Sequence, residues 1–288
     1  MIVITGANGA FGRQVVERLL SRVPAEELAV SVRDPSASPF AARGVAVRQA
    51  DFDRPQTLAA AFAGAGTVLI NGTNYGTAPA DRARQQAGVL RAALDAGATR
   101  IVVTSWFDLD NRPPAIAADY PETEKLLAAS APAWTILRMT YGMAASLARD
   151  VLAAEHAGEL TAPAAAARAT PAATADLAEA TAAVLTGPGH DAKTYELSGP
   201  EAIDWHDLAA LAAERAGRPI AYHPVSEQEC AAQWSAEGWP PQAVTALLDY
   251  YAAFRAGWAG TARPDLAALL GRPPASCLDA VRQALPPA

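Results

Sequence analysis

The chain has 288 residues, of which 51% are hydrophobic and 18% are charged, and its formal net charge is -7. So much apolar side chain excludes a disordered chain and allows one large domain or two modest ones. The acidic balance argues against a nucleic-acid-binding surface, because contacts to phosphates need clustered cations.

Short apolar runs rich in β-branched residues alternate with helical patterns along the first part of the chain. The apolar runs are continuous, as expected for strands buried on both faces. This alternation predicts an α/β fold, with a parallel sheet covered by helices on both faces. The expected strands are residues 2–5, 28–32, 45–48, 67–70, 100–104 and 134–138, and the expected helices are 11–20, 55–62, about 81–95 and 122–130.

The pattern changes after residue 138. Residues 144–172 are rich in alanine and show no clear strand, and we expect the biased stretch 162–173 to be a mobile loop. A helix over 176–185 and a strand over 194–197 follow, and this strand is expected to return to the main sheet. From Trp205 onward the chain is mostly helical, with Pro and Gly breaks at 217–219, 238–241 and 271–274.

These elements predict two domains. The first is a sheet domain formed by residues 1–140 plus about 174–200. The second is a smaller, mainly helical cap formed by about 141–173 plus 201–288. In open α/β sheets ligands bind beyond the carboxyl ends of the strands, and the cap is expected to bind the substrate.

A glycine-rich loop, Gly6-Ala7-Asn8-Gly9-Ala10-Phe11-Gly12, follows the first strand directly and opens the first helix. Gly6 allows the tight turn, Gly9 lets the backbone approach a diphosphate, and Gly12 lets the helix pack against the strand. The helix N-terminus adds N–H donors and the positive end of its dipole. A glycine-rich turn without a ligand is the alternative.

The tip of the second strand indicates which dinucleotide binds. An acidic residue there would take the 2′-hydroxyl of the adenosine ribose, but the chain has Arg33, about 20 residues beyond Gly12. A guanidinium suits a 2′-phosphate, which favours NADP(H) over NAD(H). The alternative is that Asp34 binds the ribose and that Arg33 points to solvent.

Two further motifs follow strands. Asp51 and Phe52 come after the third strand, where such a pair commonly borders the adenine, with the carboxylate at the amino group and the aromatic ring nearby. Asn71, Gly72 and Thr73 follow the fourth strand, where the backbone passes the diphosphate and the nicotinamide ribose. Either motif could instead be an ordinary turn at the end of a strand.

Taken together these motifs resemble a known family, the NmrA-like atypical short-chain dehydrogenases, and within it the type-2 NAD(P)H:quinone oxidoreductases. The resemblance covers most of the chain and implies a Rossmann-like doubly wound sheet with a smaller helical subdomain that binds the substrate. The family also contains ether reductases of the isoflavone type and redox-sensing regulators that bind the cofactor without turnover. The motifs are Thr5 to Gly12, Val32 to Pro35, Gln49 to Phe52, Thr104-Ser105, Glu122 to Lys125, and Tyr195 to Gly199.

Many short-chain dehydrogenases use a serine and a tyrosine, with a lysine four residues after the tyrosine that lowers its pKa. Ser105 ends the fifth strand and Lys125 lies in the next helix, but the residue four before Lys125 is Pro121. Tyr120 lies five before, which turns the two side chains about 140° apart on a helix of 3.6 residues per turn. The usual dyad is therefore absent as such.

This absence favours an acceptor that needs no strong acid. Reduction of a ketone gives a basic alkoxide, whereas reduction of a quinone gives a much less basic hydroquinone anion. Lys125 would anchor the nicotinamide ribose and stabilise the developing oxyanion. The alternative is a surface lysine that pairs with Glu122 or Glu124.

The sixth strand ends at Thr140 and Tyr141, which are expected to face the nicotinamide and the substrate. Tyr141 is a second candidate proton donor after Tyr120, and a packing role is the alternative for each tyrosine. The candidate cofactor-binding residues are thus Gly6, Asn8, Gly9, Ala10, Phe11, Gly12, Arg33, Asp51, Phe52, Asn71, Gly72, Thr73, Thr104, Lys125 and Thr140.

The cap is rich in aromatic residues, which would suit stacking on a polycyclic substrate, although packing in the core is the alternative for most of them. We therefore expect an NADPH-dependent reductase of a quinone, including aromatic polyketide-type quinones. The alternatives are an NADP(H)-binding redox-sensing regulator and an enone or ether reductase. The aromatic residues are Trp205, Trp234, Trp239, Tyr250, Tyr251, Phe254 and Trp258, together with Trp106 and Phe107 at the fifth strand.

The remaining features set the environment. Cys230, Cys277 and the histidines have no metal-ligand spacing, so neither a metal nor a disulfide framework is expected. No run of about 18 apolar residues is present, so no membrane span is expected. Met1 leads directly into an apolar run without a basic segment, which predicts no signal peptide and a cytoplasmic location. A homodimer is the ordinary expectation for such a chain.

Overall fold

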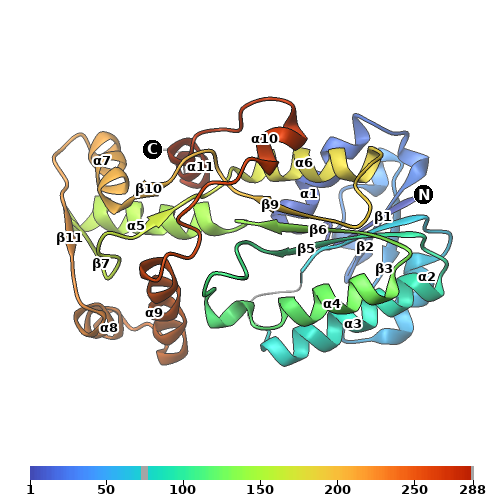
Figure 1. The fold of residues 1–288 in the computed structure, drawn as a ribbon, viewed down its shortest axis with the longest axis horizontal. Helices are drawn as coiled ribbons and strands as arrows, with labels where there is room; N and C mark the ends of the chain where they lie inside the picture. The colour runs from blue at the N-terminus through green and yellow to red at the C-terminus, as the bar shows by residue number, and fades with distance from the viewer. Residues whose placement is uncertain (73–76, 287–288) are drawn as a thin grey trace. The chain divides into compact units, whose positions relative to one another are not determined.

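The structure is a computed structural model that describes residues 1–72 and 77–286 (Figure 1). The chain forms two compact units. Unit 1 comprises Met1–Trp106, Ala118–Met139 and Ala175–Tyr195, and unit 2 comprises Phe107–Ala117, Thr140–Thr174 and Glu196–Ala288.

Unit 1 contains a seven-stranded sheet in the order β3-β2-β1-β4-β5-β6-β9. The first six strands pair in parallel. Two backbone hydrogen bonds, from Ala192 N to Trp134 O and from Thr140 N to Leu197 O, show that β9 is parallel to β6. The predicted Rossmann-like fold is confirmed. The strands are β1 (Ile2–Thr5), β2 (Leu28–Val32), β3 (Ala46–Gln49), β4 (Thr67–Ile70), β5 (Arg100–Trp106), β6 (Ala133–Met139) and β9 (Lys193–Leu197).

Helices cover both faces of this sheet (Figure 1). On one face lie α1 (Ala10–Leu20) and α6 (Thr174–Thr186), joined by ion pairs from Arg18 and Arg22 to Glu179. On the other face lie α2 (Leu58–Phe62), α3 (Pro79–Asp95) and α4 (Tyr120–Ser130). Their apolar side chains pack on central strand residues such as Val68 and Ile101 to form the main core.

The predicted helices start one to three residues away from their observed starts, and two of these differences have a local cause. The helix predicted over 55–62 is divided in two: Pro55–Thr57 form a 3₁₀ turn, and α2 begins at Leu58. The helix predicted over 122–130 begins at Tyr120, because Pro121 in the first turn has no need of an N–H donor. Three other short 3₁₀ segments, Ala25–Glu27, Pro35–Ala37 and Ala41–Arg43, lie in loops of unit 1.

Unit 2 is mainly helical. Two pairs of short strands accompany its helices: β10 (Ile203–Asp204) pairs antiparallel with β8 (Arg168–Ala169), and β11 (Tyr222–Pro224) pairs parallel with β7 (Leu160–Ala162). A 3₁₀ turn spans Ala115–Ala117. The helices are α5 (Met143–Ala157), α7 (Trp205–Ala216), α8 (Glu227–Ala236), α9 (Pro241–Arg255), α10 (Asp265–Leu270) and α11 (Cys277–Ala284).

The expectation of a mobile loop over 162–173 is wrong, as is the absence of strands from 144–172. The segment carries β8 and the end of β7, and Ala164 and Thr170 are fully buried. Thr170 Oγ1 also donates a hydrogen bond to the carbonyl of Ala259, 3.0 Å away. Alanine-rich composition conceals this burial, because a methyl group fits a close-packed interior as readily as it fits a loop.

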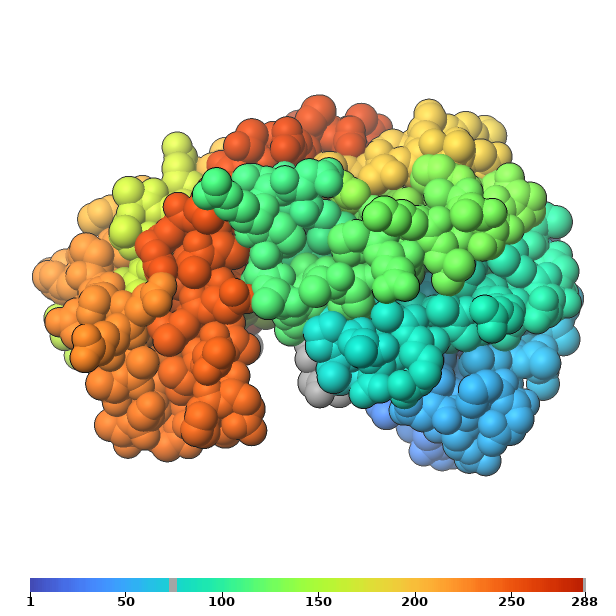
Figure 2. Space-filling model, turned by 60° about the horizontal axis from the view of Figure 1, so that its bottom comes forward, coloured from blue at the N-terminus to red at the C-terminus, as the bar shows by residue number. Residues whose placement is uncertain are grey.

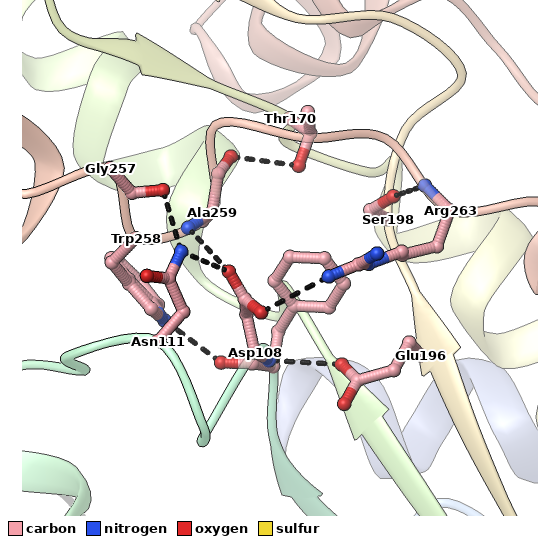
Figure 3. Close-up of polar contacts among 10 residues, drawn as sticks. Asp108, Asn111, Thr170, Glu196, Ser198, Gly257, Trp258, Ala259 and Arg263 are labelled. Atoms are coloured by element: carbon pink, nitrogen blue, oxygen red, sulfur yellow. Dashed lines mark hydrogen bonds and ion pairs between the residues drawn. The ribbon is translucent and has the colours of Figure 1, made fainter.

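A buried polar cluster fixes the segment that follows β5 (Figure 3). The carboxylate of Asp108 accepts hydrogen bonds from Asn111 Nδ2 at 3.0 Å and from Ala259 N at 3.2 Å, and it lies 3.4 Å from Arg263 Nη2. Asp108 and Ala259 have φ of +52° and +55°, a strained conformation for residues with a Cβ. Further bonds from Asp108 N to Glu196 and from Trp258 Nε1 to the Phe107 carbonyl hold the same segment. We call these residues the Asp108 cluster.

Two features of the described residues, 1–72 and 77–286, bear on the environment. None of their helices is both long and apolar enough to cross a membrane. They also contain no group of three or more His, Cys, Asp or Glu side chains that could hold a metal ion.

Candidate active site

The loop between β1 and α1 has the geometry of a diphosphate-binding turn. Gly6 has φ of +64°, and Gly9 N donates to Gly6 O at 3.0 Å. A Cβ on Gly12 would lie only 2.4 Å from Gly6 O, so only glycine lets the helix approach this closely. Gly9 is the N-cap of α1 and supplies no side-chain cap, which leaves the helix N-terminus open to an anion.

A pocket of about 460 Å³ opens beside this loop, within unit 1. It lies at the carboxyl ends of β1, β2 and β3, where open parallel sheets bind nucleotides. Its lining includes seven of the sequence-predicted residues. The lining residues are Gly6, Asn8, Gly9, Ser31, Val32, Arg33, Asp34, Ala50, Asp51, Phe52, Asp53, Gly72, Thr77 and Gln85.

Arg33 and Asp34 both line this pocket and both are exposed. The Asp34 carboxylate already accepts hydrogen bonds from Ser36 Oγ at 2.6 Å and Ser36 N at 2.9 Å. The bonds from the Ser36 side chain and backbone lower the pKa of Asp34. Asp34 is thus engaged in its own turn, whereas Arg33 is the one cation among the described lining residues.

Several buried polar atoms in or beside the pocket have no hydrogen-bond partner among the residues that the structure describes. They are Asn8 Oδ1, Ser31 Oγ, Asn71 Oδ1 and Gln85 Oε1. An unpartnered buried polar group costs roughly 1–3 kcal/mol, so a native protein rarely keeps one without a use. The hydroxyl and amino groups of a dinucleotide are donors of the kind that these acceptors need, and the residues therefore fit such a cofactor.

Hydrogen bonds tie the chain that follows β4 to the ends of β1 and β5. Asn71 donates from N to Thr5 Oγ1 at 2.9 Å and from Nδ2 to Thr5 O at 2.7 Å. Gly72 N donates to Thr104 Oγ1 at 3.0 Å. Thr104 therefore holds the chain that follows β4, while the predicted Thr73 lies outside the described residues.

Ser105, at the end of β5, belongs to a buried network that the sequence interpretation missed. Ser105 Oγ donates to Glu124 Oε1 at 2.5 Å, and Arg138 donates to the same carboxylate from Nε at 2.9 Å and from Nη2 at 2.7 Å. Glu124 is only 8% exposed. Counted forward from Tyr120, the residue four positions on is Glu124, so a carboxylate bound by Arg138 stands where the usual dyad has lysine.

Tyr120 is buried at the start of α4, on the same helix face as Glu124. Its hydroxyl lies beside Gly72, 3.2 Å from where a Cβ on that glycine would be, and its ring centroid lies 5.9 Å from that of Trp106. The residue before it, Asp119, accepts hydrogen bonds from Arg82 Nη2 and Nε on α3. This ion pair is almost completely buried and fixes the start of α4.

The remaining candidate residues, Lys125, Thr140 and Tyr141, lie outside this buried network. Lys125 is exposed on α4, and Glu124, one of its two expected partners, instead binds Ser105 and Arg138. Thr140 and Tyr141 belong to unit 2, where Thr140 Oγ1 accepts a hydrogen bond from Ala172 N at 3.0 Å and Tyr141 is half-buried.

Most aromatic residues of unit 2 are core residues. Trp205, Phe254 and Trp258 are at most 2% exposed, and Asp150 accepts hydrogen bonds from Trp205 Nε1 at 2.9 Å and Tyr251 Oη at 2.6 Å. These rings therefore pack the interior. The half-buried rings are those of Trp234 and Trp239, at α8 and the turn after it, and of Tyr250 on α9. The packed pair α8 and α9 forms a lobe of unit 2 (Figure 2).

The fold and the pocket define a Rossmann-type protein that binds a nicotinamide dinucleotide. A family model described as NAD(P)H-binding matches residues 6–188. Quinone oxidoreductase 2 of Escherichia coli K12 is 34% identical over 98% of this chain and 97% of that protein. The chain therefore belongs to the NAD(P)H-binding, NmrA-like family and is an NAD(P)H-dependent reductase, as the sequence predicts.

Solved structures agree over nearly the whole chain. The NADPH-dependent quinone oxidoreductase from Escherichia coli, complexed with NADPH, has a TM-score of 0.91 at 32% identity and covers 98% of this chain and 99% of that chain. The Citrobacter sp. triphenylmethane reductase, complexed with NADP(H), has a TM-score of 0.90 at 28% identity over 99% of each chain. The predicted binding of NAD(P)H is confirmed.

Proposed function

We propose that this chain transfers a hydride from NADPH to a quinone, with polycyclic aromatic quinones as the preferred class. The reaction consumes one proton and gives NADP⁺ and the hydroquinone. The bound dinucleotide supplies the hydride, and the protein binds it, orients the acceptor and provides the proton. The observation that carries the proposal is the network of Ser105, Glu124 and Arg138 beside Tyr120.

This network bears on the acceptor through its charge. A lysine one helical turn after a catalytic tyrosine stabilises the phenolate and makes the tyrosine a proton donor for basic alkoxides. Here Glu124 occupies that place, and its charge is balanced by Arg138 rather than by the substrate. Such a site suits an acceptor whose reduced form is a weak base, as a hydroquinone anion is.

Arg33 supports NADPH over NADH. Its guanidinium lies in the pocket beyond the second strand, and a bond between a guanidinium and a phosphate contributes roughly 1.5–3 kcal/mol when well shielded. We expect Arg33→Ala to weaken NADPH binding about tenfold and to leave NADH binding nearly unchanged. Arg43→Ala, which removes an exposed arginine paired with Glu17, is the matched control. Equal weakening of both cofactors would contradict the assignment.

The acceptor is tested by NADPH oxidation with a benzoquinone, a naphthoquinone, an anthraquinone, a triphenylmethane dye and an aliphatic ketone. We expect turnover with the quinones, fastest for the polycyclic ones, and none with the ketone. Turnover of the ketone at a comparable rate would refute the argument from Glu124. Tight NADPH binding without turnover of any acceptor would favour the regulator instead.

Four residues are proposed to act in catalysis, and single variants rank them. Tyr120→Phe and Tyr141→Phe remove the two candidate proton donors, and Ser105→Ala removes the hydroxyl bound to Glu124. Lys125→Ala tests the exposed lysine for a role in ribose binding. Full turnover by Lys125→Ala together with a large loss in Tyr120→Phe would assign the proton to the tyrosine, and the reverse result would assign the lysine.

A further inference from the structure

Gln85 is a buried polar residue of the cofactor pocket that the sequence motifs did not single out. It lies on the buried face of α3, is 7% exposed and lines the pocket. Its Nε2 donates a hydrogen bond to Asp53 Oδ1, 2.7 Å away. Asp53 immediately follows Phe52, whose aromatic ring is packed at the edge of the main core.

The hydrogen bond to Asp53 fixes which way the Gln85 amide faces. A carboxylate only accepts hydrogen bonds, so the amide NH₂ must face Asp53, and the amide oxygen must face away from it. That oxygen, Oε1, is buried and has no hydrogen-bond partner within residues 1–72 and 77–286. The side chain is therefore a fixed acceptor, held in the pocket wall by a carboxylate and lacking a donor.

We propose that Gln85 Oε1 accepts a hydrogen bond from the exocyclic amino group of the cofactor's adenine, with Asp53 as the residue that orients it. This rests on the proposed use of NADPH. With the diphosphate at Gly6 and Gly9 and the ribose 2′-phosphate at Arg33, the base lies toward the turn that carries Phe52 and Asp53. The amino group is the one donor on adenine, because its ring nitrogens are acceptors. Gln85 thus makes the pocket selective for adenine.

The ribose hydroxyls are the other hydrogen-bond donors in this half of the cofactor. An analogue with a different base distinguishes a contact to the adenine amino group from a contact to the ribose. Isothermal calorimetry would compare NADP⁺ with nicotinamide hypoxanthine dinucleotide phosphate, in which a carbonyl replaces the amino group and the ribose is unchanged. A site built to bind an amino group rejects an analogue that lacks it, and we expect the analogue to bind at least tenfold more weakly.

Two variants assign this preference to Gln85. Gln85→Leu is expected to bind both dinucleotides with nearly equal affinity. Gln86→Leu is the matched control, because Gln86 is the same residue type at the next position, is also buried with an unpartnered Oε1, and bonds Asp119 outside the pocket lining. It should keep the preference for adenine.

Equal binding of the two dinucleotides by the wild-type chain would overturn the proposal without any variant. An unchanged preference in Gln85→Leu would overturn it, in favour of a ribose contact where both affinities fall alike and in favour of the Asp51 carboxylate where neither affinity falls. Failure of the wild-type chain to bind NADP⁺ at all would overturn the proposed use of NADPH as well, so the two failures are distinguishable.

Discussion

The ion pair between Glu124 and Arg138 allows a quantitative test of the buried network. Both side chains are largely buried, at 9% and 15% exposed, and the carboxylate accepts two hydrogen bonds from the guanidinium. Removing one partner of such a pair leaves a buried charge without compensation, which costs about 3–5 kcal/mol. Glu124→Leu and Arg138→Met should each lower the free energy of unfolding by that amount.

The double variant is the informative one. Replacing both members of a buried ion pair by apolar residues of similar volume is often neutral or stabilising, because no charge has to leave water. Glu124→Leu combined with Arg138→Met should therefore be more stable than either single variant. Ser105→Ala, which removes one neutral donor to Glu124, should cost only about 1 kcal/mol and serves as a control for the loss of a single hydrogen bond.

Urea unfolding followed by far-ultraviolet circular dichroism measures all four variants against the wild type. A buried, charge-coupled pair should show a coupling energy of several kcal/mol between the two charged residues in the double-mutant cycle. If the losses of the single variants simply add in the double variant, or if each single loss is below about 1 kcal/mol, the network is not the buried, charge-coupled unit described here.

Three further predictions concern separate parts of the molecule. Gly12→Ala should lower the free energy of unfolding by about 1–3 kcal/mol and the affinity for NADP(H) at least tenfold, because the added Cβ clashes with the phosphate loop. Gly88→Ala is the control, because its Cβ would meet no neighbouring atom within 4 Å, and it should raise the free energy of unfolding by about 0.5–1 kcal/mol. Urea unfolding and calorimetry measure both variants, and a Gly12→Ala variant with unchanged stability and affinity would contradict the packing argument. Burial raises the pKa of Asp150 above its ordinary 3.8, so its contribution to the free energy of unfolding is complete below pH 3.8 and is lost as pH rises through the raised pKa. Urea unfolding over a pH series should therefore show a fall in stability with rising pH, and this fall should be smaller in Asp150→Asn. Burial also raises the pKa of Cys230 and of Cys277 to about 12, so mass spectrometry should find both thiols unmodified by iodoacetamide at a mildly alkaline pH until the chain unfolds.

The sheet of unit 1 could be predicted because its signals are local. Each strand is a continuous apolar run between turn residues, and the loop from Gly6 to Gly12 has a glycine at position 12, where an added Cβ would lie 2.4 Å from Gly6 O. The fold of residues 162–173 could not be predicted in the same way. Their burial depends on partners such as Ala259, far along the chain, and alanine carries almost no signal for one environment over another.

Site residues could be predicted from the sequence where a motif follows the end of a strand. They could not be predicted where side chains from different helices and strands bind one another. Arg33, Asp51 and Phe52 are found by position after β2 and β3 and do line the pocket. A count of four residues back from Lys125 reaches Pro121 and gives no role to Glu124, whereas a count of four forward from Tyr120 reaches Glu124. The forward spacing of four, together with the polar residue it places on a buried face, was the signal available in the sequence.

Buried polar groups with and without hydrogen-bond partners have different roles in this chain. In unit 2 the Asp108 carboxylate contacts Asn111, Ala259 and Arg263, and such a saturated group holds loops in place at the expense of two strained backbone conformations (Figure 3). In unit 1 the acceptors of Ser31 and Gln85 are also buried, and they have no partner among the residues that the structure describes. A missing partner indicates a ligand where the residue also lines the pocket, as Gln85 does and Gln86 does not. The sequence lists the polar residues but does not show which of them bind one another. It could therefore predict the loop that binds the cofactor, but it could not assign a role to a pocket residue such as Gln85.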